Sequence, residues 1–229
     1  MTAHPDDYMC DCHWGSAEEL AQLKVPDIEL EPDLLRRTWW GSSWSYPADV
    51  LRRILPQFAS GLVSGVVEPM FDMGQPGLVF RRGNWQEWPT EQAAAIWELL
   101  HAWWAHALTD PEPVVPTYEV LAFCTEASST LTPWLDIWAT STYPLADRRL
   151  AETATHWEWD LLSDVLPWHT YYDEAEKAAE LSAWLVRHAP DRLRRCGVPE
   201  KRVFRIGLLA LSGRERWDHP YWSREDAED

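Results

Sequence analysis

Three residues near the start of the chain, Cys10, Cys12 and His13, are of the types that bind zinc. Structural zinc sites take four thiolate or imidazole ligands, with paired cysteines that are separated by two to four residues. Only one residue separates Cys10 from Cys12, and no second pair with a zinc-binding spacing follows in the sequence. We therefore expect no metal or other cofactor, and these three residues are the candidate metal ligands near the start of the chain.

A second pattern places Glu98 and His101 three residues apart on a predicted helix, as in the Glu-x-x-His motif of di-iron bundles. That site needs a second Glu-x-x-His and two further glutamates, and the sequence has no second copy. Glu152, His156 and Asp160 follow one another at intervals of four, on one face of another predicted helix. Ordinary contacts between solvated side chains explain such a face without a metal. A metal-dependent enzyme or sensor is therefore kept only as the alternative function.

The sequence contains no recognised motif for nucleophilic catalysis. No serine or cysteine stands in a nucleophile elbow or triad motif, and neither a glycine-rich phosphate loop nor a dinucleotide-binding fingerprint is present. Histidines such as His106 and His169 could act as acids or bases only with partners that the sequence does not reveal. We therefore expect that the protein is not an enzyme.

Proline, capping residues and apolar periodicity predict helices along most of the chain. The strongest, near 89–108, carries an apolar stripe with a helical period, and Ser16 with Glu19 forms a capping box before another helix. The expected helices and short helical turns cover about 16–23, 32–40, 47–62, 89–108, 117–127, 132–140, 144–165, 173–188, 191–196 and 199–212. Residues 66–88, rich in Gly and Pro, are expected to be a loop, with a hairpin around Leu78–Phe80 as the alternative.

These signals predict an all-α fold of about nine helices, either an antiparallel helical bundle or an irregular array of helix pairs. The expected domain organisation is a single helical domain over residues 1–213, in which residues 1–15 can be mobile, followed by a polar C-terminal tail over 214–229. No run of eighteen apolar residues occurs, and the first residues lack the basic and apolar regions of a secretory signal. We expect a cytoplasmic protein.

The formal net charge of −17 is distributed unevenly. From Gly83 to Asp147 there are nine acids and neither Lys nor Arg, whereas Arg187 to Arg205 holds seven basic residues against two acids. An acidic surface repels nucleic acid and anionic membranes, so neither is an expected partner. The natural complement is a basic protein.

Seventeen tryptophans are present, and three of them, Trp39, Trp40 and Trp44, lie at a predicted helix end and the turn that follows. An indole there is either a lid on the core or an exposed anchor for a partner, because tryptophan combines a large apolar area with one donor. The candidate partner-binding residues are these aromatics and nearby acids: Trp39, Trp40, Trp44, Glu87, Asp110 and Glu112.

Three segments carry a resemblance to a group of uncharacterised bacterial all-helical proteins: CDCHW, LRRILPQF, and the stretch from Trp85 to Trp104, which begins W-x-x-W-P-x-E and ends A-W-W. The likeness covers about the first half of the chain. It departs from the group by lacking a third N-terminal cysteine. The group has no established activity, so the resemblance implies no function for any residue.

These observations predict an acidic protein-binding inhibitor, the immunity protein of a bacterial toxin, which would occlude a basic toxin domain. Two alternatives stay open: a metal-binding enzyme or sensor that uses zinc or iron, and a helical scaffold that binds without inhibiting.

Overall fold

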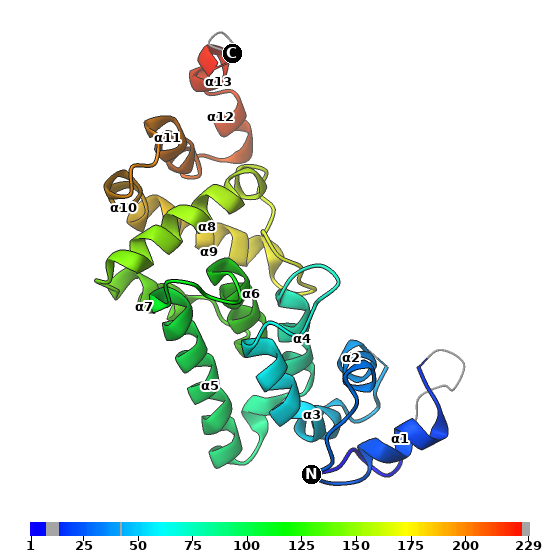
Figure 1. Cartoon of the computed structure of the whole chain (residues 1–229). Coiled ribbons are helices and arrows are strands. Elements are labelled where there is room, and N and C mark those ends of the chain that lie inside the picture. The colour runs from blue at the N-terminus through cyan, green and yellow to red at the C-terminus, as the bar shows by residue number, and fades with distance from the viewer. Residues whose placement is uncertain (8–13, 42, 226–229) are drawn as a thin grey trace. The chain divides into compact units, whose positions relative to one another are not determined.

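The computed structural model describes residues 1–7, 14–41 and 43–225, and in these ranges the chain is helical and forms no strand (Figure 1). The elements are α1 Ala17–Leu23, α2 Pro32–Trp40, α3 Pro47–Val63, α4 Gly74–Arg82, the 3-10 helix η1 Trp85–Glu87, α5 Thr90–Thr109, α6 Thr117–Ser128, α7 Thr132–Thr140, α8 Pro144–Leu162, α9 Glu174–His188, α10 Pro190–Arg195, α11 Glu200–Leu208, α12 Gly213–Trp217 and α13 Pro220–Glu225. The all-α prediction is confirmed. The expected number of about nine helices is too low.

The largest difference from the predicted helices lies in 66–88, where the expected loop contains α4 and η1. Gly74, Pro76 and Gly77 oppose a helix by propensity, but all three are buried in α4. At Gly77 an added Cβ would lie 2.7 Å from the carbonyl oxygen of Phe123 on α6, so the absence of a side chain lets the two helices approach closely. Tertiary packing therefore stabilises a helix that local propensity does not predict.

A predicted helix start agrees with the structure where neighbouring residues supply the capping hydrogen bonds. The predicted capping box is present, because the Ser16 hydroxyl accepts from the Glu19 amide and the Glu19 carboxylate accepts from the Ser16 amide. The helix predicted from residue 173 is present as α9, and Asp173 occupies the position just before its first residue, Glu174. Asp173 has a left-handed backbone with φ of 53°, and its side chain makes no capping hydrogen bond to α9.

The chain divides into two compact units, which are described separately. Unit one comprises residues 1–107 and 112–130, and contains α1 to α4, η1, most of α5, and α6. A series of aromatic contacts runs through its core, with centroids 5.5 Å apart for Trp39 and Phe58, 6.0 Å for Phe58 and Phe80, 5.1 Å for Phe80 and Phe123, and 5.1 Å for Phe123 and Trp103. These rings belong to α2, α3, α4, α6 and α5, so one apolar core joins the five helices.

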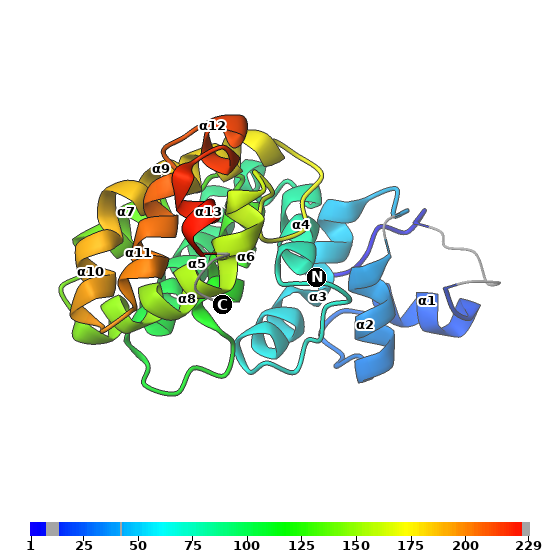
Figure 2. The same cartoon turned by 90° about the horizontal axis from the view of Figure 1, so that it is seen from above.

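Unit two comprises residues 108–111 and 131–229, and α8 is its central helix. Figure 2 shows α9, α10 and α11 alongside α8, which packs against all three. Trp138 and Trp157 are fully buried in this unit. The segment expected as a polar tail contains α12 and α13, and Arg216 of α12 is only 3% exposed.

In the described part of the chain, no helix has both the length and the apolar character that crossing a membrane requires.

Candidate functional site

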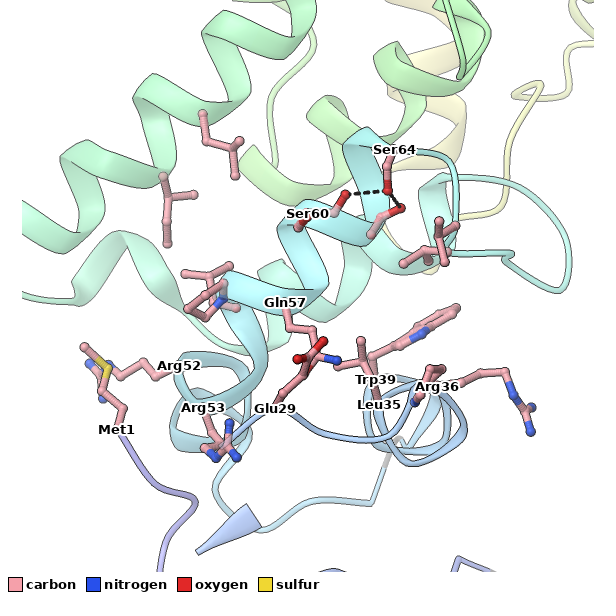
Figure 3. Close-up of a pocket in the computed structure, with 18 of the residues that line it drawn as sticks. Met1, Glu29, Leu35, Arg36, Trp39, Arg52, Arg53, Gln57, Ser60 and Ser64 are labelled. Atoms are coloured by element: carbon pink, nitrogen blue, oxygen red, sulfur yellow. Dashed lines mark hydrogen bonds between the residues drawn. The ribbon is translucent and has the colours of Figure 1, made fainter. Parts of the chain in front are cut away.

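The main concave feature of unit one is a groove of about 1200 Å³ (Figure 3). Its apolar lining comes mainly from α2, α3 and the first half of α5, and includes Leu35, Trp39, Leu55, Pro56, Ile96 and Leu99. Figure 3 shows Gln57 and Ser60 along α3, with Leu35 and Trp39 on α2 facing that helix. Such a continuous apolar recess on one unit is typical of a binding surface.

Two side chains one helical turn apart on α3 hold the segment before α2 at the edge of this groove. Gln57 donates to the Leu30 carbonyl at 2.6 Å and accepts from the Leu30 amide at 3.0 Å. Arg53 donates to the carbonyl oxygens of Val25 and Ile28, at 3.1 and 2.8 Å. Burial lowers the pKa of Arg53, and nearby Asp27 partly offsets that effect. The groove wall is therefore positioned by partly buried hydrogen bonds.

The arginines that line the groove are already engaged within unit one. Arg52 lies 3.2 Å from a carboxylate oxygen of Asp49, and its guanidinium stacks over the Trp88 ring at 4.3 Å. Arg36 lies 2.5 Å from a carboxylate oxygen of Asp33 and stacks over Trp40 at 4.9 Å. Both cations are thus neutralised by an acid three residues earlier on the same helix.

Two carboxylates on the groove edge, Glu29 and Glu68, are exposed. Within the described ranges, neither forms an ion pair or a side-chain hydrogen bond. They give the edge of an apolar recess a negative charge that is open to a partner.

The predicted partner-binding tryptophans lie mainly in the core. Trp39 and Trp44 are 2% and 9% exposed, so both act as lids on the core and neither presents its ring face as an exposed anchor. The Trp44 indole donates to the Thr38 carbonyl at 2.9 Å, which fixes the turn after α2. Trp40 is partly exposed beneath Arg36.

The predicted acids do not converge with these aromatics. Glu87 is exposed on η1, Glu112 is exposed in unit one, and Asp110 is partly exposed and belongs to unit two. Of the six predicted partner-binding residues, Trp39 is the one that lines the groove.

The metal candidates Cys10, Cys12 and His13 lie outside the described residues. Over the residues that the structure describes, no group of three or more His, Cys, Asp or Glu side chains could hold a metal ion. His101 and Glu98 are exposed on α5, and His156 is exposed on α8.

Sequence reasoning missed Glu29, Gln57, Glu68 and the role of Arg52. The spacing of Arg53 and Gln57, four residues apart on a helix that is otherwise apolar on that side, is a usable signal for side chains that face a neighbouring segment. No comparable signal marks Glu29 or Glu68.

No protein-family model, curated protein or solved structure matches this chain. The resemblance to uncharacterised bacterial helical proteins therefore stays a prediction.

Proposed function

We propose that this protein is a protein-binding inhibitor, the immunity partner of a bacterial toxin, and that it occludes a basic domain of that toxin. The observation that supports the proposal is the charge arrangement around the groove of unit one. There the arginines are paired internally, while the carboxylates of Glu29 and Glu68 remain exposed beside an apolar floor.

This arrangement suits inhibition by direct contact. An apolar recess supplies the area that excludes water, and exposed carboxylates attract a basic surface and speed its association. Cations that are already paired within the unit do not repel such a partner. The groove and its edge together would therefore favour a protein surface that carries both apolar and basic side chains.

The test is co-expression of the chain with the product of each adjacent gene, scoring growth and co-purification. We expect one neighbour to be toxic alone, harmless with the chain, and recovered in complex with it. Reversing the edge charge with Glu29→Lys and Glu68→Lys should weaken the rescue, because like charges then face the basic partner.

The absence of any toxic neighbour, or toxicity that the chain does not relieve, would contradict the proposal. A neighbour that binds but is neither toxic nor inhibited would instead identify a scaffold. Stoichiometric zinc or iron in the purified chain would favour the metal-binding alternative.

A further inference from the structure

We infer that the groove of unit one receives one amphipathic helix of the partner, with leucine-like side chains on its floor and a lysine or arginine at its edge. This inference rests on the proposed function, because it names the part of the partner that would be bound. Two observations support it: the size of the groove, and the excess of unpaired hydrogen-bond acceptors over unpaired donors among the residues that line it.

The size of the groove favours a polypeptide. Its volume of about 1200 Å³ exceeds the range of roughly 300–1,000 Å³ that holds small molecules. Apolar side chains from three helices, α2, α3 and α5, line it, which is the setting in which an amphipathic helix binds through residues three and four apart. Partner residues spaced in this way would meet Leu55, Pro56 and Leu99, which line the groove and keep exposed surface.

One backbone acceptor at the groove follows directly from the sequence. Pro56 lies inside α3 and has no N–H, so it cannot donate to the carbonyl of Arg52 four residues earlier. Both residues line the groove, so this carbonyl lies on the groove side of the helix. A donor from a partner would satisfy it.

Further acceptors lie in the same groove. The Oε1 atom of Gln92 is buried and accepts no hydrogen bond, and the carboxylates of Glu29 and Glu68 face solvent. By contrast, the Arg53 guanidinium is bonded to two carbonyls and Arg36 to Asp33. Arg52 keeps an unbonded Nε, but its guanidinium is already paired with Asp49 and stacked on Trp88.

The groove therefore needs donors more than acceptors. A helix satisfies its own backbone groups, so these donors must come from its side chains, and a cationic side chain also matches the two edge carboxylates. An anionic amphiphile would be repelled by the same carboxylates. Lysine or arginine flanked by leucine-like residues is the chemistry that fits.

The test uses the full chain and a capped synthetic peptide of repeating Leu-Lys-Lys-Leu-Leu-Lys-Leu, about four helical turns long. A matched peptide with glutamate in place of lysine is the control ligand. Calorimetric titration should give saturable one-to-one binding of the lysine peptide, and binding of the glutamate peptide at least about tenfold weaker.

Two variants locate the binding. The double change Glu29→Gln and Glu68→Gln should raise Kd about tenfold, since two exposed ion pairs are lost. The control pair Glu91→Gln and Glu98→Gln removes the same charge from α5 outside the groove, and should change Kd less than about twofold. Leu55→Gln should also weaken binding, because it places a polar group on the floor.

Equal weakening by the two double variants would overturn the inference, since it would show only a general attraction of opposite charges. So would equal affinity for the two peptides, or unchanged affinity in Leu55→Gln when circular dichroism shows the variant folded.

If co-expression identifies a neutralised toxin but the groove variants bind and protect normally, this inference fails while the proposed function stands. If the peptide binds in the groove but no adjacent gene product is toxic, the proposed function fails.

Discussion

The two units use arginine in different ways. In unit one, Arg36 and Arg52 lie at the surface and pair with acids on their own helices, beside an open apolar groove. In the described part of unit one Arg53 is the one buried arginine, whereas unit two has four: Arg149, Arg192, Arg205 and Arg216. The comparison teaches that unit two uses charge to hold its helix ends together, whereas unit one leaves apolar surface uncovered and is the better candidate for binding.

Arg216 is the clearest example in unit two. Its guanidinium donates to the carbonyls of Leu161, Leu208 and Leu211 at 3.1, 3.3 and 3.0 Å, and also to the carbonyl of Leu162. These carbonyls lie at or just beyond the C-terminal ends of α8 and α11, where the regular intrahelical hydrogen bonds end; Leu161 and Leu208 also accept from the amides of Asp164 and Leu211. One side chain therefore caps two helices.

The largest expected effect is the loss of this cap. Arg216→Ala should lower the free energy of unfolding by about 3–5 kcal/mol, because it removes five hydrogen bonds at once and takes the side-chain donor from the carbonyls of Leu162 and Leu211. The matched control is Arg214→Ala on the same short helix, whose side chain is 93% exposed, and it should change stability by less than about 0.5 kcal/mol. Urea unfolding followed by circular dichroism measures both. A similar cost for the two variants would show that the buried network does not support unit two.

Two helical glycines give effects of opposite sign in the two units. Gly77→Ala should destabilise unit one by about 1–3 kcal/mol, because the new methyl group would meet the Phe123 carbonyl and Glu126 on α6. Gly207→Ala in α11 of unit two should stabilise by about 0.5–1 kcal/mol, since no atom lies within 4 Å of the added Cβ. Thermal unfolding of both variants decides this. A stabilised Gly77→Ala would mean that α4 and α6 do not pack closely.

The smallest expected effects concern the dependence of stability on pH. One acid in unit one and one acid in unit two should show dependences of opposite sign. Burial raises the pKa of Glu119 in unit one; the Met73 amide, which donates at 2.7 Å, opposes the shift and Asp72 adds to it. Because the pKa of Glu119 is higher in the folded state, the contribution of this residue to stability is fully present below its unfolded pKa of about 4.3. It is lost as pH rises through the folded pKa. Glu119→Gln should therefore be more stable than the parent chain at pH 7, and this advantage should shrink near pH 4.5.

Asp147 in unit two has the opposite dependence. Burial tends to raise its pKa, but hydrogen bonds from Arg195 and Arg192 outweigh burial and lower it. A lowered pKa contributes stability above the unfolded value of about 3.9, and this contribution is lost as pH falls through the folded pKa. Asp147→Asn should therefore cost stability at pH 7 and progressively less below about pH 4. A constant cost across this range would show that the carboxylate charge is unimportant.

The sequence predicts the elements whose signals are local. Pro32, Pro47 and Pro144 mark helix starts, and the apolar period of 89–108 identifies α5, because these features act within a few residues. The helix α4 escaped prediction because its stability depends on contact with α6, some forty residues later in the chain.

The groove could not be predicted for a similar reason. Leu55 and Leu99, which keep exposed surface, lie next to the fully buried Ile54 and Leu100 on their helices, and the sequence does not show which of them a neighbouring segment covers. The buried state of Trp39 and Trp44 depends in the same way on how α2 packs against α3. The negative charge of Glu29 and Glu68 at the groove edge could be recognised only once the structure showed which acid pairs with each arginine.

The most direct test of the account is hydrogen–deuterium exchange of the chain, free and bound to the neighbouring gene product that co-expression identifies as its partner. We expect slower exchange in the complex at residues 25–31, in α2 and α3, and in the first turns of α5, with little change in α9 to α11. Protection confined to unit two, with the groove helices unchanged, would contradict the claim that unit one binds the partner.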